Sequence, residues 1–315
     1  MEFNSGDRIV VKGKEYEVKS IRIEDYEFLK KYYMMRRPET SDSNIFDLYL
    51  WQSAYDTRYI CGETGLIFFS LGDNGRYYST IPLCKKENLK EWFEILKDLH
   101  NNILGQKLNI VVCDKEALEE LRLDEEIYDI DRQREYDDYI YDAEKLRTLS
   151  GKKYHKKKNH LNAFLRENEG RYEFRELSCV NRQELLDFLS EWIDDKDDEE
   201  KREYIDYEAE GVKYILDYCN ILEFKVAGVY IDEKLQAFTI GCYIEEDDMV
   251  YVPVEKANAS VRGLYNYISS EFLKRLFPEV SKVNREDDMG LEGLRKSKLS
   301  YNPIYLVEKY RITEK

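Results

Sequence analysis

The chain has 315 residues, of which 43% are hydrophobic and 36% charged, and its formal net charge at pH 7 is −16. This length suits two domains of about 150 residues, and the hydrophobic content argues against a disordered chain. Because a strongly acidic protein repels nucleic acid and anionic lipid at long range, contact with either requires a local basic patch.

The cysteines and the N-terminus point to a reducing compartment. The six cysteines are Cys61, Cys84, Cys113, Cys179, Cys219 and Cys242. They form no CxxC pair and several lie in hydrophobic runs, so we expect free thiols and neither disulfides nor a metal site. The first residues lack the features of a signal peptide, and no apolar run is long enough for a transmembrane segment. The sequence therefore predicts a cytoplasmic protein.

Hydrophobic periodicity and turn residues predict alternating helices and strands along the first half of the chain. A polar N-terminal stretch comes first. The predicted elements are then helices over 23–35 and 43–55, strands over 58–62, 66–71 and 77–82, a helix over 87–101, a strand over 108–113, a helix over 115–121 and a strand over 136–142.

The second half repeats part of this order. Its predicted elements are a helix over 151–168, a strand over 172–177, helices over 182–194 and 204–218, strands over 224–231, 235–244 and 249–255, a helix over 262–277, a strand over 280–284, a helix over 291–298 and a strand over 305–311. A three-strand meander followed by helix, strand, helix and strand thus occurs twice. We predict an α/β fold with two similar domains, 1–145 and 146–315, each a mixed twisted sheet flanked by helices.

Three separated segments resemble one known family. They are 43–51 (SNIFDLYLW), 151–162 (GKKYHKKKNHLN) and 284–303, which includes NREDDMG and KLSYNP. In this order they resemble bacterial proteins similar to the C-terminal domain of phosphatidylglycerol lysyltransferase, over nearly the whole chain. The resemblance implies a tandem GNAT fold similar to the Fem peptidyltransferases, which move an aminoacyl group from tRNA to an amine or hydroxyl acceptor. The lysyltransferase also has a membrane-embedded domain, which has no counterpart here, and this argues against a lipid acceptor.

The loop after the strand at 280–284 is the predicted catalytic segment, because ligands gather at the carboxyl ends of strands in open α/β sheets. Arg285 is suited to bind a phosphate or carboxylate, and Glu286 or Asp288 to bind the acceptor amine or take its proton. Lys298 is suited to meet a phosphate or stabilise a carbonyl oxygen, and Asn284 and Ser300 to contact the substrate. The alternative is a solvated charged loop, with Arg285 paired to Glu286 or Asp288 and Lys298 favouring the helix dipole.

The turn from the strand at 249–255 into the next helix is the place where GNAT folds bind the pyrophosphate of coenzyme A. Lys256, Arg262 and Gly263 are the predicted cofactor-binding residues there, aided by free N–H groups at the helix start. Only Arg262-Gly263 remains of the usual glycine-rich pattern. An ordinary strand-to-helix connection is therefore the alternative.

The segment 151–166 contains six Lys or Arg and no acidic residue. Lys153, Lys156 and Lys157 are the predicted contacts for an RNA backbone, which would make binding salt-dependent. Pairing with an acidic surface of the other domain is the alternative.

Together these features predict an acyl or aminoacyl transferase whose active site lies between the two halves, with the segments around Asn284 and Lys298 forming one wall. Aminoacyl-tRNA is favoured as donor over acyl-CoA, because the glycine-rich loop is degenerate and a basic helix is present. A small molecule, a peptide or a lipid headgroup remains open as acceptor. The alternatives are an acyl-CoA-dependent N-acyltransferase and a non-catalytic GNAT-like binding module.

Overall fold

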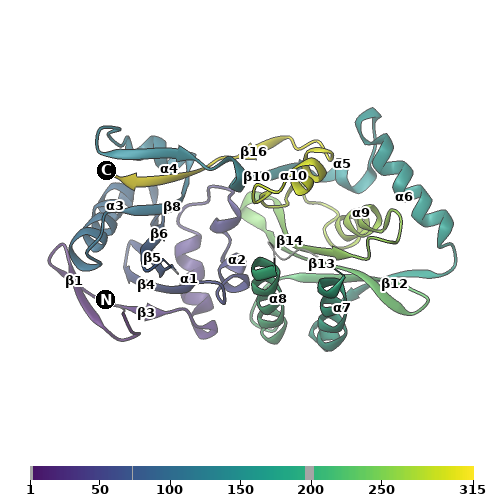
Figure 1. Cartoon of the computed structure of the whole chain (residues 1–315), viewed down its shortest axis with the longest axis horizontal. Helices are drawn as coiled ribbons and strands as arrows, with labels where there is room; N and C mark the ends of the chain where they lie inside the picture. Colours follow the sequence, from purple (N-terminus) through teal and green to yellow (C-terminus); the bar gives the residue numbers. More distant parts are fainter. Residues whose placement is uncertain (1–2, 73, 196–201) are drawn as a thin grey trace. The chain divides into compact units, whose positions relative to one another are not determined.

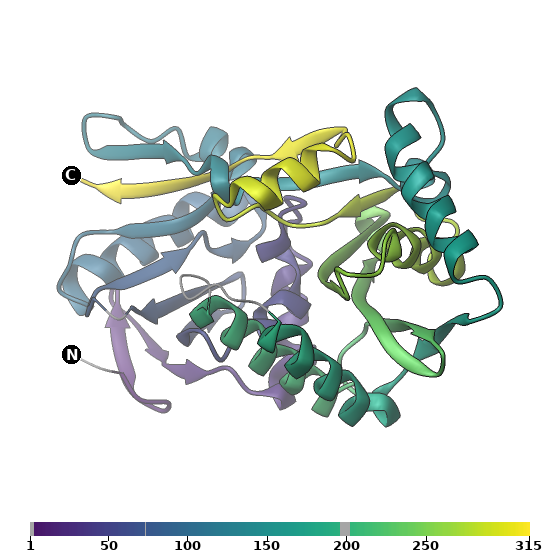
Figure 2. The same cartoon turned by 45° about the vertical axis from the view of Figure 1, so that its right-hand side comes forward.

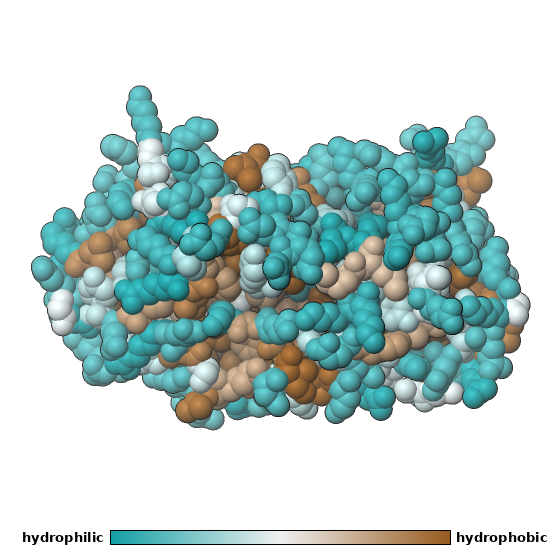
Figure 3. All heavy atoms as spheres, turned by 180° about the vertical axis from the view of Figure 1, so that it is seen from behind, coloured by the Kyte–Doolittle hydropathy of each residue, from teal (hydrophilic) through white to brown (hydrophobic). Residues whose placement is uncertain are grey.

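The computed structural model describes residues 3–72, 74–195 and 202–315. The chain forms two compact units, Met1–Asp137 with Val307–Lys315 and Asp138–Leu306, each of which builds a sheet with helices packed on it (Figures 1 and 2). The face drawn in Figure 3 is mostly hydrophilic, in keeping with the large share of charged residues.

The first unit contains a mixed sheet with the strand order β3-β4-β5-β6-β8-β17-β9. Neighbours from β3 to β6 are antiparallel, β6 and β8 are parallel, and β17 lies antiparallel between β8 and β9. The strands of this sheet are β3 (Lys19–Ser20), β4 (Asp56–Gly62), β5 (Gly65–Leu71), β6 (Tyr77–Thr80), β8 (Asn109–Asp114), β9 (Tyr128–Arg132) and β17 (Lys309–Glu314), with β7 (Leu83–Cys84) paired to β5.

The N-terminal stretch, which the sequence analysis left without structure, forms a hairpin. β1 (Arg8–Val11) pairs antiparallel with β2 (Lys14–Glu17). Val11 and Tyr16 are buried in the hydrophobic core of this unit while their neighbours on each strand are exposed. The alternation is too short for a confident pattern in the sequence, because each strand has four residues.

The helices of the first unit are α1 (Tyr26–Tyr33), α2 (Ile45–Leu50), α3 (Leu89–Asp98) and α4 (Lys115–Leu121). α3 is amphipathic, and its hydrophobic residues, among them Trp92 and Leu96, are buried in the core. A π-helical turn, Leu99–Ile103, continues α3 and contains His100, which is fully buried. Burial lowers the pKa of His100 to about 4, and its Nε2 lies 2.9 Å from Ser79 Oγ, so this histidine is a neutral core residue.

The second unit contains a sheet with the strand order β11-β12-β13-β14-β15-β10-β16. β11 to β14 form an antiparallel series, β14 and β15 are parallel, and β15 and β10 are antiparallel. The strands are β10 (Asp138–Asp142), β11 (Tyr172–Leu177), β12 (Lys225–Ile231), β13 (Lys234–Ile244), β14 (Met249–Ala257), β15 (Lys282–Asn284) and β16 (Tyr305–Val307).

Helices cover both faces of this second sheet (Figure 1). Phe238 of β13 contacts Phe188 of α7, whereas Gly241 of the same strand faces Phe272 of α9; odd spacing along a strand places these contacts on opposite faces. α5 and α6 pack on α9, and α8 packs on α7. The helices are α5 (Ala143–Thr148), α6 (His155–Glu167), α7 (Arg182–Asp194), α8 (Arg202–Asp217), α9 (Leu264–Leu276) and α10 (Glu292–Leu299).

The two units differ from the predicted ranges 1–145 and 146–315 because strands are exchanged between the halves of the sequence. β10, which the sequence analysis took as the last strand of the first half, lies between β15 and β16 in the second unit. The predicted strand over 305–311 is two strands, of which β16 remains in the second sheet while β17 enters the first. Hydrophobic patterning shows that a segment is a strand but not which sheet it joins, because any edge with free hydrogen-bonding groups can accept it.

A β-bulge in β14 reverses the faces of its last residues. The register pairs Ile240 with Val254 and Cys242 with Tyr251, so that Val252 and Pro253 lie opposite one residue of β13. A proline is tolerated in such a bulge because it has no N–H to donate to the ladder. The pairing with β15 ends at the bulge, with Tyr251 opposite Asn284, and β14 continues to Ala257 while β15 gives way to a loop.

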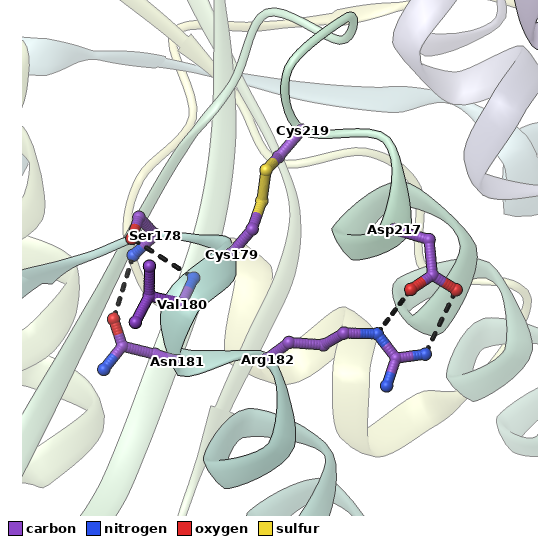
Figure 4. The surroundings of a disulfide bond; sticks show 7 residues. All are labelled: Ser178, Cys179, Val180, Asn181, Arg182, Asp217 and Cys219. Carbon is purple, nitrogen blue, oxygen red and sulfur yellow. Dashed lines mark hydrogen bonds and ion pairs between the residues drawn. A yellow bond between two sulfur atoms is a disulfide. The ribbon is translucent and has the colours of Figure 1, made fainter.

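A disulfide joins Cys179 and Cys219 in the second unit, which corrects the expectation of six free thiols (Figure 4). Cys179 precedes α7 and Cys219 follows α8, and their Cα atoms are 6.2 Å apart. Beside them Arg182 pairs with both carboxylate oxygens of Asp217 at 2.5 and 3.1 Å. The sequence gives no signal for this bond because the cysteines are 40 residues apart, and the pairing of the two helices brings them together. Cys61, Cys84, Cys113 and Cys242 form no disulfide.

Gly263 at the start of α9 is required by close packing against α6. Its φ is +79°, and a Cβ at this position would lie 2.0 Å from the carbonyl oxygen of His160. We predict that Gly263→Ala lowers the free energy of unfolding by about 1–3 kcal/mol, because it adds backbone strain to this clash. Urea denaturation measures the effect.

The matched control for this substitution is Gly293→Ala. Gly293 lies in α10, where an added Cβ has no heavy atom within 4 Å. Alanine favours a helix, so this variant should be neutral or more stable by up to about 1 kcal/mol. Equal effects of the two substitutions would contradict the packing argument.

Candidate functional site

The loop after β15 is shaped by its own polar side chains. Asn284 Oδ1 accepts from the N–H of Glu286 at 2.7 Å, Asp287 Oδ1 from Met289 at 3.0 Å and Asp288 Oδ1 from Gly290 at 3.0 Å. Such turns tolerate left-handed backbone, which Glu286 and Met289 adopt with φ of 55° and 49°. The loop is therefore an ordered structure and not a freely solvated connection.

Asp288, a predicted catalytic residue, anchors this loop through contacts with Tyr139 and Arg295. It is fully buried, and its carboxylate accepts from the Tyr139 hydroxyl at 2.6 Å and from Arg295 Nε and Nη2 at 2.9 and 2.7 Å. Burial by itself would raise the pKa of Asp288, but the ion pair and hydrogen bonds prevail and lower it to about 2. A carboxylate bound in this way is a poor proton acceptor, so the geometry favours a positioning role for Asp288.

Lys298 supports the same loop from α10. Its ammonium donates to the carbonyl oxygens of Arg285, at 2.6 Å, and of Asp287. Burial lowers the pKa of Lys298 to about 8, against the opposing effect of Asp287 and Glu286. The carbonyl of Lys298 in turn accepts from the Tyr141 hydroxyl at 2.9 Å. These contacts favour a role in holding the loop over the direct contact with a phosphate expected from the sequence.

Arg285 points away from the acidic loop and pairs with Glu255 of β14. Its Nη2 lies 2.8 Å from Glu255 Oε1, and the two side chains are 16% and 9% exposed. Burial would lower the pKa of Arg285, but Glu255 raises it, so the guanidinium stays charged. The sequence analysis named Glu286 or Asp288 as the partner and missed Glu255. Pro253 was the available signal, because a proline within a strand indicates a bulge, and the bulge sets the face on which Glu255 lies.

Tyr301 provides the ring against which the cations of this site lie. The Arg285 guanidinium is 5.1 Å and the Lys157 ammonium 3.8 Å from the ring centroid. The hydroxyl accepts from Asn266 Nδ2 at 2.5 Å, and the Tyr301 carbonyl accepts from the Tyr154 hydroxyl at 2.9 Å. Burial raises the pKa of Tyr301 to about 12, so the phenol keeps its proton at neutral pH. We call Lys157, Glu255, Asn266, Arg285 and Tyr301 the Arg285 cluster.

The lysines of α6 and of the 3-10 turn before it (Lys152–Tyr154) divide into half-buried and exposed ones. Lys157 is half-buried against Tyr301, and burial, followed by the nearby Arg285 charge, lowers its pKa to about 8 while Glu255 opposes the shift. Lys153 and Lys156, the other predicted RNA contacts, are exposed. Ser300 is also exposed, and its hydroxyl donates to the Ser297 carbonyl at the end of α10.

Comparison with protein families matches residues 34–313 to the C-terminal domain of phosphatidylglycerol lysyltransferase. The chain belongs to this family. An uncharacterized protein of Mycoplasmoides gallisepticum is 26% identical over 179 residues, and the chain spans 55% of the length of that relative. Within the described residues, no helix is long and apolar enough to span a bilayer.

Solved structures show how far the family fold extends. A Bacteroides thetaiotaomicron protein of unknown function is 28% identical, with 95% of this chain and 99% of that one covered and a TM-score of 0.85. L-PGS from Bacillus licheniformis is 16% identical over 91% of each chain, with a TM-score of 0.61. A tandem GNAT protein from the clavulanic acid biosynthesis pathway is 10% identical over 95% and 98% of the two chains, with a TM-score of 0.52. The fold is therefore that of tandem GNAT proteins, as the sequence predicted.

The three residues predicted to bind a cofactor do not converge in this family member. Lys256 forms a buried ion pair with Glu208 of α8 at 2.5 Å and lies 4.4 Å from the Trp192 ring centroid. Arg262 is exposed, and its Nη1 lies 3.6 Å from Glu167 Oε1. Gly263 contacts the backbone of α6. This placement favours the ordinary strand-to-helix connection over a pyrophosphate cradle.

Replacement of Asp288 tests the positioning role. We predict that Asp288→Asn lowers the free energy of unfolding at pH 7 by about 1–3 kcal/mol, because Arg295 loses its anionic partner. The folded-state pKa of Asp288 is below its ordinary 3.8, so its stabilisation is present above that value and is lost as the pH falls toward 2. Thermal unfolding of the wild type and of Asp288→Asn is measured between pH 7 and pH 2. The difference between their unfolding temperatures should become smaller as the pH falls below 3.8 toward 2.

Glu292→Gln is the control for the pH series, because Glu292 is an exposed residue in the first turn of α10. It should change the unfolding temperature little at any pH. If the unfolding temperatures of wild type and Asp288→Asn differed by the same amount at every pH from 7 to 2, the lowered pKa of Asp288 would be contradicted.

Proposed function

We propose that this protein transfers an aminoacyl group from aminoacyl-tRNA to an amine or hydroxyl acceptor. The family and the GNAT-like fold support an acyl or aminoacyl transferase, since the family is that of a lysyltransferase. The observation that favours a reaction at this site is the Arg285 cluster. There the guanidinium of Arg285, the protonated phenol of Tyr301 and the half-buried amine of Lys157 lie together, beside the end of the parallel pair β14 and β15.

Each member of the cluster suits one part of acyl transfer from an ester. A fixed cation near the carbonyl stabilises the negative charge that develops on its oxygen, and Arg285 is such a cation. A phenol that is protonated at neutral pH can give a hydrogen bond or a proton to the departing oxygen, which suits Tyr301. The neutral form of Lys157 can take the proton of the acceptor. Glu286 is proposed to bind the acceptor amine.

The donor preference rests on α6. Lys153, in the 3-10 turn Lys152–Tyr154 that precedes α6, and Lys156, in the first turn of α6, are exposed, and the adjacent Lys157 lies in the cluster, so an RNA backbone along the start of α6 would bring its end toward Tyr301. Acyl-CoA is less favoured, because Lys256 is engaged by Glu208. The acceptor is proposed to be a small molecule, a peptide or a lipid headgroup, and the cytoplasm is the proposed location.

The direct test measures the release of a radiolabelled amino acid from aminoacyl-tRNA into fractions of small molecules, peptides and lipids from a bacterial extract. Thermal shift with a 3′-aminoacylamino-adenosine analogue, tRNA and coenzyme A accompanies it. Transfer together with stabilisation by the analogue is expected. Stabilisation by coenzyme A alone would overturn the donor, and no transfer with no ligand effect would favour a non-catalytic binding module.

The phenol of Tyr301 is tested by Tyr301→Phe, which keeps the ring and removes the hydroxyl. We predict a fall in kcat/KM for transfer of about 100-fold or more, because a positioned proton donor contributes on that order. The control is Tyr305→Phe, which makes the same chemical change at a tyrosine that is 39% exposed. Comparable activity of the two variants would exclude the phenol from the reaction.

The double variant Lys153→Ala/Lys156→Ala tests the two exposed lysines around the start of α6. Loss of two phosphate contacts should weaken tRNA binding and reduce the slope of log affinity against log salt by about 1–2. Filter binding at several salt concentrations measures both quantities. The matched control is Lys225→Ala/Lys234→Ala, which removes two exposed lysines from β12 and β13. If the control variant lost as much tRNA affinity and as much salt dependence, the effect would come from net charge and not from contacts at Lys153 and Lys156.

A further inference from the structure

Lys157 differs from the other lysines of α6 in what surrounds its ammonium. Its Nζ lies 3.8 Å from the Tyr301 ring centroid, and Arg285 lies against the same ring at 5.1 Å. The carboxylate of this site, Glu255, is already paired with Arg285 at 2.8 Å. Among the described residues Lys157 forms no ion pair and no side-chain hydrogen bond, so only the ring and the nearby Glu255 carboxylate stabilise its charge.

The charged groups that face Lys157 come from several elements. Arg285 follows β15, Glu255 lies on β14, and Tyr301 follows α10. α9 contributes the uncharged Asn266, whose amide is used by Tyr301. Partial burial and the like charge of Arg285 therefore oppose protonation of the Lys157 amine, and Glu255, which favours it, is already paired with Arg285. A partly buried lysine that forms no ion pair and lies near another cation is suited to act as a nucleophile.

We propose that Lys157 is an acyl acceptor within the protein itself, modified on its ε-amine by activated acyl donors such as acyl phosphates and aminoacyl esters. The neutral amine attacks the donor carbonyl, a C–N bond forms and the C–O bond to the leaving group breaks. The leaving phosphate or alkoxide departs, and the proton lost by the amine passes to it or to water. The product is a stable amide on a neutral side chain.

Acylation would alter the Arg285 cluster in two ways. It removes one positive charge from the face of Tyr301, and it adds volume to a half-buried side chain that contacts a nearly buried ring. An acylated Lys157 can neither take a proton nor contact an anion, so the modified protein would have a blocked site. The proposal concerns the reactivity of one side chain and is independent of which donor and acceptor the protein uses in transfer.

The test labels the intact protein with limiting acetic anhydride at pH 7.5 and, separately, with acetyl phosphate. Remaining amines are then acetylated with deuterated anhydride under denaturing conditions, and chymotryptic peptides of α6 are analysed by mass spectrometry. At pH 7.5 a lysine with a pKa near 8 has about 100-fold more neutral amine than an ordinary lysine with a pKa near 10.4, and lower intrinsic nucleophilicity reduces the advantage to about tenfold. We expect Lys157 to be labelled about tenfold more than Lys153 and Lys156, and to be the α6 lysine acetylated by acetyl phosphate.

Two variants test whether the charge of Arg285 causes the reactivity of Lys157. In Arg285→Gln, loss of the like charge should raise the pKa of Lys157 and reduce its labelling at pH 7.5, whereas Lys156→Arg should leave labelling of Lys157 unchanged. Circular dichroism checks that each variant is folded. Labelling that follows exposure, with Lys153 and Lys156 ahead of Lys157, would overturn the proposal. The assay contains no tRNA and measures no transfer, so a failure of the proposed function and a failure of this proposal give different results.

Discussion

The buried ion pair between Arg285 and Glu255 is the interaction on which the rest of the site depends. A buried pair contributes little net stability, but loss of one partner leaves an uncompensated charge and typically costs about 3–5 kcal/mol. The pair also fixes the directions of a side chain on β14 and one in the loop after β15, and thereby sets where the guanidinium meets the Tyr301 ring. An alanine at Arg285 would for this reason disturb folding as well as chemistry, so the phenol and amine of the cluster are better probes of function.

The loop that leads from β15 into α10 illustrates how charge can serve structure. The side chains of Asn284, Asp287 and Asp288 each accept a hydrogen bond from the backbone N–H two residues ahead. Asp288 is in addition bound by Arg295 and Tyr139. Lys298 closes the other side by donating to two carbonyls. These contacts hold a strained backbone segment in one conformation. Asp288 and Lys298, which the sequence analysis interpreted as catalytic, are thus placed to position Arg285, the loop residue that reaches the cluster.

Much of the second unit could be predicted from local patterns. β11 (Tyr172–Leu177) and α7 (Arg182–Asp194) have the bounds that periodicity predicted, because each is bordered by turn residues and has a clear buried face. The candidate site was predicted less well. Arg285, Lys157 and Tyr301 lie in the segments on which the family resemblance was based. Glu255 and Asn266 lie outside those segments, and a glutamate at the end of a strand or an asparagine in a helix has no distinctive local signal.

The sequence by itself determined most of the element order, the presence of two similar halves and the segments that hold the unusual charges, because these follow from hydrophobic period and turn chemistry. It did not predict the strands β1, β2 and β9, which are short. The tertiary structure alone decided that β10 and β17 pair outside their own halves, that Cys179 meets Cys219, and that Glu255 and not Glu286 or Asp288 neutralises Arg285. Each of these depends on which distant segments become neighbours. That choice is made by packing over the whole unit and is not encoded in any local pattern.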